Sequence, residues 1–130
     1  MSAKVALVQT ALSQYANGQI EEFLGILSPT CVWKEPEGGS LSGEWVGPAA
    51  ILENLFKPLA EAWEWRHVSV DAIYEAPNGK VYVQGVEEGT NRATGKSATS
   101  SFTHVLTIDG GQLTSFEHIT DTHIFREIEA

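Results

Sequence analysis

Apolar and polar residues alternate along four consecutive stretches in the second half of the chain. A period of two is typical of a β-strand with one buried face, because successive side chains point to opposite sides of the sheet. Short turns containing glycine separate the stretches, and Asn78-Gly79 is the strongest of these hairpin signals. The pattern therefore predicts an antiparallel meander. Its strands are expected at residues 65–76, 80–91, 97–108 and 112–125.

The first half of the chain repeats its apolar residues at helical spacing instead. The expected helices are residues 5–15, 20–27 and 48–58. One short strand, residues 31–35, is expected before the third helix, and Pro58 is expected to kink or end that helix. Helices that are segregated in sequence from an antiparallel sheet are typical of the α+β class. The length of 130 residues, with no repeat or linker, fits a single domain over residues 1–130.

Charge and composition exclude several classes of function. The chain has eight basic and seventeen acidic residues, a net charge of −9, and its basic residues are scattered. Phosphate binding needs clustered cations, so we expect no nucleic-acid partner. No apolar run approaches the ~20 residues that span a bilayer, and the N-terminus lacks the apolar core of a signal peptide. With a single cysteine, Cys31, the sequence indicates a cytoplasmic protein without a membrane partner.

The short strand carries an acid on the face that should be buried. Period-two alternation places Cys31, Trp33 and Glu35 on one side of it. Burying an ionised carboxylate costs several kcal/mol unless the group is paired, protonated or used in chemistry. Glu35 is therefore a candidate catalytic residue. The alternative is an acid at the rim, beside Lys34 and Glu37, where the strand ends and the side chain reaches water.

Two sequence patterns, together with this order of elements, resemble a known superfamily. The patterns are GxWxGPxAI at residues 43–51 and VxTxDGGxLxSFxHxTDT at residues 105–122. They resemble the NTF2-like superfamily, and within it the SnoaL-like and ketosteroid-isomerase-related proteins. The resemblance implies a cystatin-like cone, in which three N-terminal helices pack on a curved antiparallel sheet and enclose a pocket. It also implies a small apolar molecule as ligand and a homodimer formed through the outer face of the sheet.

The resemblance assigns roles to residues around the expected pocket. Glu35 takes the place of the family's proton-shuttling carboxylate, which removes a proton α to a carbonyl and returns it elsewhere. Trp33, Trp45 and Phe56 would form apolar walls, with Trp45 at the opening. Tyr15 lies one turn beyond the position of the family's first-helix tyrosine and would reach the cavity as a hydrogen-bond donor.

A histidine stands where the family's aspartic acid would precede VLTIDG. Alternation groups this residue, His104, with Phe102 and Leu106 on an apolar face, so we expect it to point inward. An imidazole there can donate a hydrogen bond to an enolate oxygen or act as a general acid or base, and it can equally be a core residue. His118 shares a strand face with Phe116 and would meet His104 across adjacent strands. Phe102 and His118 are accordingly expected in the binding pocket.

The last expected strand contains FEHITDTH. Asp121 occupies the position of a late catalytic aspartate in SnoaL-like cyclases, which makes it a third catalytic candidate beside Glu35 and His104. Asp121 and His118 are three residues apart, so a regular strand puts them on opposite faces and only a bulge would turn both inward. The alternative for Asp121 is a turn or an ion pair at the strand end. His123 is expected nearer to solvent.

Other common chemistries leave no signature in the sequence. The histidines and candidate acids show no recognised metal-ligand spacing, so no metal site is predicted. Glycine motifs for nucleotide binding are absent, so no cofactor is expected. Cys31 is expected to be a small buried hydrophobe rather than a nucleophile.

Two hypotheses from different classes follow. The first is a cofactor-independent isomerase or cyclase-like enzyme that transfers a proton on an apolar carbonyl or polyketide-like substrate, with Glu35 as the base. The second is a non-catalytic small-ligand-binding or dimerisation module of the same fold. An epoxide hydrolase is disfavoured, because that chemistry needs an arginine between two inward acids and Arg66, Arg92 and Arg126 offer no such arrangement.

Overall fold

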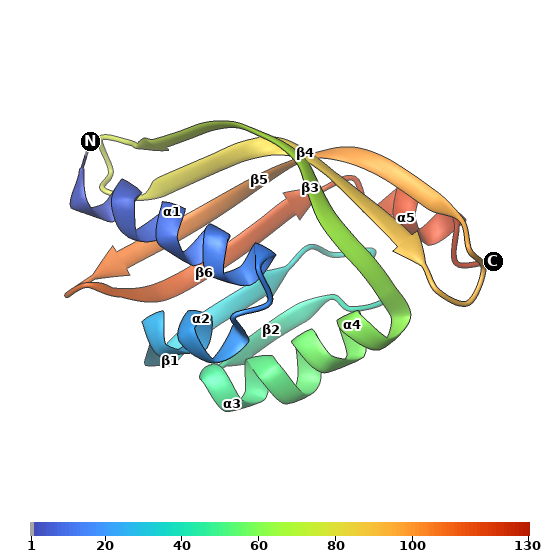
Figure 1. Ribbon diagram of the computed structural model, residues 1–130, viewed down its shortest axis with the longest axis horizontal. Helices are drawn as coiled ribbons and strands as arrows, with labels where there is room; N and C mark the ends of the chain where they lie inside the picture. The colour runs from blue at the N-terminus through green and yellow to red at the C-terminus, as the bar shows by residue number, and fades with distance from the viewer. Residues whose placement is uncertain (1) are drawn as a thin grey trace.

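The computed structural model describes residues 2–130, in which helices pack against one curved six-stranded sheet (Figure 1). The strands are β1 (Leu27–Glu35), β2 (Gly43–Val46), β3 (Trp63–Glu75), β4 (Val81–Asn91), β5 (Ser97–Asp109) and β6 (Gln112–Thr120). They follow the order β2-β1-β6-β5-β4-β3 across the sheet. Neighbouring strands are antiparallel except β1 and β6, which are parallel. The α+β class and the predicted meander, which forms β3 to β6, are confirmed.

The helices gather on one side of the sheet, apart from one at the C-terminal end (Figure 1). They are α1 (Ala3–Ala16), α2 (Ile20–Ile26), α3 (Pro48–Ile51), α4 (Lys57–Ala62) and α5 (Thr122–Glu127). The hydroxyl of Ser2 accepts a hydrogen bond from the backbone N–H of Val5 and so caps α1. Within residues 2–130, none of the helices combines the length and the apolar character that crossing a membrane requires.

Pro58 changes the helix around it but does not end it. The chain remains helical through this residue up to Ala62. Proline has no N–H to donate to the carbonyl of Asn54, four residues earlier. The preceding turn is a π-helix, in which the N–H of Lys57 donates to the carbonyl of Leu52, five residues earlier. This wider turn accommodates the missing hydrogen bond between α3 and α4.

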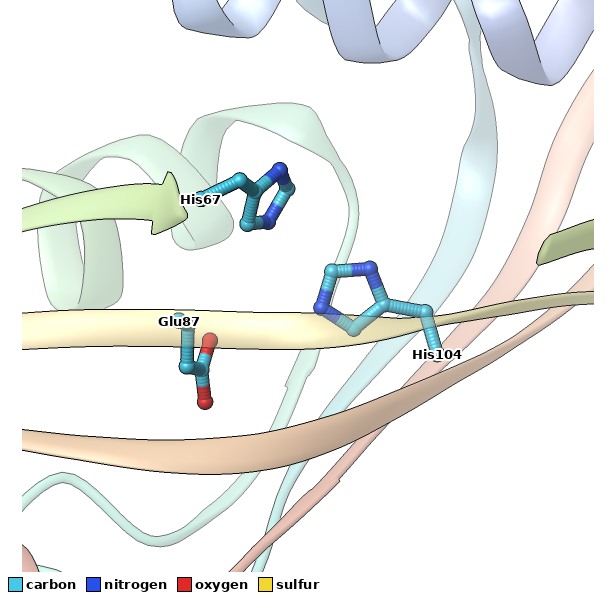
Figure 2. A group of neighbouring side chains, drawn as sticks. All are labelled: His67, Glu87 and His104. Atoms are coloured by element: carbon cyan, nitrogen blue, oxygen red, sulfur yellow. The ribbon is translucent and has the colours of Figure 1, made fainter. Parts of the chain in front are cut away.

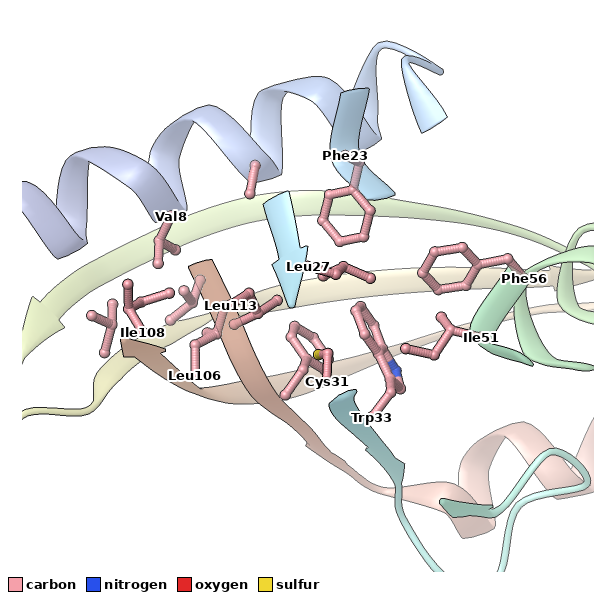
Figure 3. Close-up of a cluster of buried hydrophobic side chains, with 14 of the residues drawn as sticks. Val8, Phe23, Leu27, Cys31, Trp33, Ile51, Phe56, Leu106, Ile108 and Leu113 are labelled. Atoms are coloured by element: carbon pink, nitrogen blue, oxygen red, sulfur yellow. The ribbon is translucent and has the colours of Figure 1, made fainter. Parts of the chain in front are cut away.

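The hydrophobic core lies between the helices and the sheet (Figure 3). Its aromatic part is centred on Trp33, whose ring stacks on Phe116 with centroids 3.7 Å apart and meets Phe56 edge-on at 5.1 Å. Cys31 precedes Trp33 on the same face of β1 and is fully buried. The predicted alternation of β1 is thus confirmed, and it delivers Glu35 to the inner face of the sheet.

Two glycines on β4 allow β3 and β5 to pack closely against it. A Cβ added to Gly85 would collide with the backbone carbonyl oxygen of Ser69, and one added to Gly89 would lie 2.8 Å from the Trp65 ring. The register of β3 against β4 shifts twice between residues 67 and 72. Bulges of this kind bend a strand and increase its twist, which curves the sheet around its inner face.

The prediction of a strand through residue 125 is wrong. β6 ends at Thr120, and the following residues form α5. Asp121 is the N-cap of this helix, and its carboxylate accepts a hydrogen bond from the backbone N–H of His123 at 3.1 Å. Residues 121–125 begin with an aspartate, which favours the start of a helix. In this structure the segment is helical from Thr122 onward.

Other boundaries differ less from the prediction. β3 begins at Trp63, two residues before its expected start, and Leu27 begins β1 instead of ending the second helix. β2 is a short strand that the sequence does not predict. It pairs with β1 and places Trp45 opposite Trp33.

Gly89→Ala is expected to lower the free energy of unfolding by about 1–3 kcal/mol, the usual cost of overpacking. The new methyl group would displace the Trp65 ring, which itself packs against Trp63 and Phe125. Urea denaturation measures the change. Gly25→Ala is the matched control, because an added Cβ at Gly25 meets no atom within 4 Å and alanine favours the helix. An equal loss of stability in both variants would contradict this account of β4.

Candidate functional site

Glu35 ends β1 with both carboxylate oxygens engaged in hydrogen bonds. The indole Nε1–H of Trp33 donates to Oε2 at 2.7 Å, and Nδ1 of His118 lies 2.9 Å from Oε1. The other imidazole nitrogen of His118, Nε2, lies 2.7 Å from Oε1 of Glu87. Glu35, His118 and Glu87 therefore form one continuous hydrogen-bonded group, called here the Glu35–His118–Glu87 chain.

Three strands that are distant in sequence supply this group. β1 runs parallel to β6 with Trp33 opposite Phe116, so Glu35 lies beside His118, two residues further along β6. Glu87 lies on β4 and reaches His118 over the intervening strand, β5. The curvature of the sheet brings these side chains together, because the inner faces of β4 and β6 turn toward each other.

The Glu35–His118–Glu87 chain is largely removed from water. The exposed fraction of the side chain is 16% for Glu35, 12% for His118 and 6% for Glu87. Burial alone would lower the pKa of His118, but the hydrogen bonds and charges of Glu35 and Glu87 outweigh it and raise the pKa to about 10. At neutral pH, His118 is therefore an imidazolium that lies between two acids.

Two further histidines line the inner face of the sheet and stay neutral. His104 lies opposite His118 on β5, with ring centroids 5.1 Å apart. Burial, followed by the charge of His118, holds the pKa of His104 well below its usual range. Burial also lowers the pKa of His67, which lies opposite Glu87 on β3. The Nδ1 atom of His104 is buried and has no hydrogen-bond partner within residues 2–130.

Tyr15 and Cys31 are held in their protonated forms. Burial, with the charges of Glu35 and Glu87, raises the pKa of Tyr15 to about 12, so its hydroxyl remains a possible donor. Burial raises the pKa of the Cys31 thiol to about 11. A thiol with so high a pKa is a poor nucleophile, which agrees with the prediction that Cys31 is a buried hydrophobe.

A small cavity opens beside Glu35 and His118. These two residues line one part of it, and the aromatic rings of Trp63, Trp65 and Phe125 line another. Its volume is about 60 Å³, well below the ~300–1,000 Å³ of sites that hold drug-sized ligands. A ligand larger than a few water molecules would therefore need a neighbouring element to move.

α5 supplies part of the cavity wall. The buried Phe125 ring meets Trp65 with centroids 4.6 Å apart and lines the cavity. Side-chain hydrogen bonds join this end of the chain to two loops. At the loop after β1, the Thr122 hydroxyl donates to the Glu37 carbonyl at 3.0 Å and the Ser40 hydroxyl donates to Glu129 at 2.9 Å. At the turn between β4 and β5, Thr94 donates to the carbonyl of Ile128 and Lys96 to that of Ala130. Exposed hydrogen bonds add little net stability, and a helix of six residues is not stable by itself.

Comparison with known families identifies the domain. The SnoaL-like domain family matches residues 8–116, which span α1 to most of β6. The chain belongs to the SnoaL-like family. The matched region includes Glu35 and Glu87 and ends two residues before His118.

Solved structures place this SnoaL-like chain in the NTF2-like superfamily. An NTF2-like protein from Burkholderia thailandensis is 26% identical, with a TM-score of 0.91 over 100% of this chain and 99% of its own. An NTF2-like protein of unknown function from Burkholderia pseudomallei is 25% identical, with a TM-score of 0.89 over 100% of both chains. TerC, crystallised with polyporic acid, is 28% identical, with a TM-score of 0.86 over 99% of this chain and 100% of its own. No curated protein sequence matches the chain significantly. The predicted fold and superfamily are confirmed.

The structure brings together two of the predicted site residues, Glu35 and His118, at the cavity. Trp33 contacts Glu35 through its indole N–H, although its ring packs in the core. His104 points inward and meets His118, as alternation predicts, but it does not line the cavity. Asp121, the third catalytic candidate, does not reach the cavity: its side chain is exposed at the start of α5, where it caps the helix, which agrees with the alternative of a structural role at the strand end.

The remaining predicted pocket residues lie in or against the core. Phe56 and Phe102 are buried there, and Tyr15 packs edge-on against Phe56. Trp45 lies on β2 and packs against the core, so the expected place at the pocket opening is not where the structure puts it. Trp63, Trp65 and Phe125 line the cavity instead.

Glu87 and His67 are functional candidates that the sequence reasoning missed. Glu87 continues the buried face of β4 that begins with Val81 and Val83, so strict alternation already placed it inside. His67 follows Trp63 and Trp65 at the same spacing on β3. Both signals were present, but neither reveals that Glu87 reaches His118 across another strand.

The stability of the protein should depend on the charge of His118. Its folded pKa of about 10 exceeds its ordinary value of 6.5, so its contribution is fully present below pH 6.5 and is lost as the pH rises toward 10. We expect the free energy of unfolding to fall across this interval, as measured by urea denaturation at successive pH values. His118→Gln should remove this slope, whereas His123→Gln, at an exposed histidine on α5, should keep it. Parallel profiles for the natural protein and His118→Gln would contradict the assignment.

Proposed function

We propose that the protein is an isomerase- or cyclase-like enzyme that moves a proton on a small, apolar carbonyl or polyketide-like molecule and needs no organic cofactor. The observation that carries the proposal is the placement of Glu35 on the cavity wall, where Trp33 and His118 hold both of its oxygens. A general base must be held within reach of the proton that it abstracts, in a fixed orientation. The hydrogen bonds to Glu35 supply that orientation.

The surrounding groups fit this chemistry. Glu35 would remove a proton from the carbon next to the substrate carbonyl, and the same carboxylic acid would return it to another carbon, so that atoms and charge balance. His118 acts as a positioning residue, because both of its nitrogens are bonded to Glu35 and Glu87. Arg126 also lines the cavity, where its guanidinium donates a hydrogen bond to Glu129 at 3.3 Å.

The cavity wall indicates the class of substrate. Leu41, Leu59, Trp63, Trp65 and Phe125 provide apolar and aromatic surface opposite the acid. Flat apolar molecules gain most from such walls, since stacking on aromatic rings adds to the burial of apolar area. TerC, which is 28% identical, was crystallised with polyporic acid, and this supports a small organic ligand for the fold. The cavity of about 60 Å³ would have to enlarge to admit such a molecule.

Glu35→Gln is expected to lower kcat for double-bond migration in a β,γ-unsaturated ketone by about 10²–10⁴-fold, the usual contribution of a general base. The change keeps the shape of the side chain and removes its basicity. Absorbance of the conjugated product measures turnover. Glu37→Gln is the matched control, because this exposed acid lies two residues away on the same loop and its loss should leave kcat unchanged. Turnover that survives Glu35→Gln would reject Glu35 as the base.

A second candidate function, a non-catalytic small-ligand-binding module, is favoured by one observation. Both oxygens of Glu35 are already engaged, which is also what a purely structural buried ion pair requires. In that case an apolar ligand would quench the fluorescence of Trp63 and Trp65 on the cavity wall without any product forming. Equal quenching in the natural protein and Glu35→Gln, with no turnover in either across carbonyl substrates, would support this module and reject the enzyme.

The outer face of the sheet supports a proposal about assembly, a homodimer formed through this face. Tyr74 stacks on Tyr82 with ring centroids 5.5 Å apart, and Val105 lies next to Tyr82 on β5. Tyr74 is 42% exposed and Ile119 on β6 is 47% exposed. A sheet that is covered by helices on one face and still carries large apolar groups on the other is typical of an interaction surface.

Ile119→Lys should convert such a dimer to monomers, because it places a charge in an apolar interface. Light scattering coupled to size exclusion measures the mass in solution, which is 14.1 kDa for one chain. Gln9→Lys, on the exposed side of α1, adds the same charge elsewhere and should leave the dimer intact. A natural protein that is monomeric at every concentration tested would overturn the proposal.

A further inference from the structure

His67, Glu87 and His104 converge on the inner face of the sheet (Figure 2). They come from three neighbouring strands, β3, β4 and β5, and each offers one nitrogen or oxygen atom such that these atoms all lie within 4.8 Å of one another. Figure 2 shows the His104 ring reaching from β5 toward the other two side chains. Glu87 and His104 are buried and His67 is half-buried.

The chemistry of these side chains suits a metal ion. Two neutral imidazoles and one carboxylate are the ligand set that first-row transition metals accept while keeping open positions. The low pKa values of His67 and His104 leave both rings unprotonated at neutral pH, with a lone pair available. Figure 2 shows the distal ring nitrogen of His104, Nε2, turned toward His67 and Glu87.

We propose that His67, Glu87 and His104 form a binding site for one divalent transition-metal ion. This inference goes beyond the proton-transfer function, which uses the opposite side of His118. His118 would then be an outer-shell residue, because its Nε2 lies 2.7 Å from one oxygen of Glu87. Hydrogen bonds of this type orient a metal-ligating carboxylate.

The geometry is close to that of a formed site. Ligand atoms about 2.1 Å from one ion in a tetrahedral arrangement are roughly 3.4 Å apart. The ligand atoms of the three residues lie within 4.8 Å of one another. Side-chain rotations that move each ligand atom by about 1 Å would bring all three to the distances of a bound ion. The local charge is favourable as well, since Glu35 and Glu87 together exceed the single positive charge of His118. The sequence does not predict this site because its ligands lie on three separate strands and follow no local spacing.

Titration of the metal-stripped protein with Co²⁺ tests the proposal, because Co²⁺ bound by nitrogen and oxygen ligands absorbs in the visible range. We expect the absorbance to saturate at one equivalent per chain and Zn²⁺ to displace the Co²⁺. His67→Gln and His104→Gln should each weaken the affinity at least tenfold. His123→Gln, at an exposed histidine outside the cluster, should leave it unchanged.

Circular dichroism of each variant separates lost binding from lost folding. His67 is half-buried on an edge strand, so His67→Gln remains decisive even if His104→Gln does not fold. Saturation at one equivalent that is weakened by His67→Gln supports the site. No stoichiometric Co²⁺ binding in the natural protein overturns it, and so does binding whose affinity is unchanged in a folded His67→Gln variant.

Discussion

The pairing of His118 with two buried acids, Glu35 and Glu87, is the interaction on which the inner face of the curved sheet depends. An unpaired carboxylate in this position would cost several kcal/mol. His118 satisfies Glu35 with one ring nitrogen and Glu87 with the other, and Trp33 adds a third donor. Removing His118 leaves both buried carboxylates without their charged partner. The arrangement therefore holds Glu35 in one orientation, whether the protein uses that acid as a base or only as part of an ion pair.

Sheet curvature is what makes this pairing possible. β4 and β6 are separated by β5, and a flat sheet would keep their side chains about 10 Å apart, two strand spacings. Gly85 and Gly89 remove side chains where β3 and β5 must come close, and the register shifts in β3 bend the edge inward. The same curvature draws His67 and His104 toward Glu87. The bend of the sheet at β3 and β4 thus positions both the candidate catalytic group and the proposed metal ligands.

Local patterns predicted a large part of this structure. Alternation correctly placed Cys31, Trp33 and Glu35 on one face of β1, and it paired His104 with His118 across neighbouring strands. It failed for residues 121–125, because Asp121 caps a helix whose few residues also alternate. The family resemblance, and not alternation, assigned Trp45 to the cavity opening, whereas Trp63, Trp65 and Phe125 are the aromatic residues that line the cavity. The two-residue alternation of a strand shows which of its faces is buried. Which aromatic side chain meets which neighbour depends instead on how segments that are distant in sequence pack together.

By itself, the sequence determined the fold class, the meander, the inward direction of Glu35 and the membership in the NTF2-like superfamily. The first three follow from periods of two and 3.6 residues and from turn residues, which act within a few positions along the chain. The superfamily came from the resemblance of two motifs, at residues 43–51 and 105–122. Only the tertiary structure decided that Glu35 pairs with His118 and that His118 pairs with Glu87. Residues 35, 87 and 118 are too far apart in sequence for any local pattern to couple them. Their contact arises from the parallel pairing of β1 with β6 and from the bend of the sheet over β5, both of which are set by packing across the whole domain.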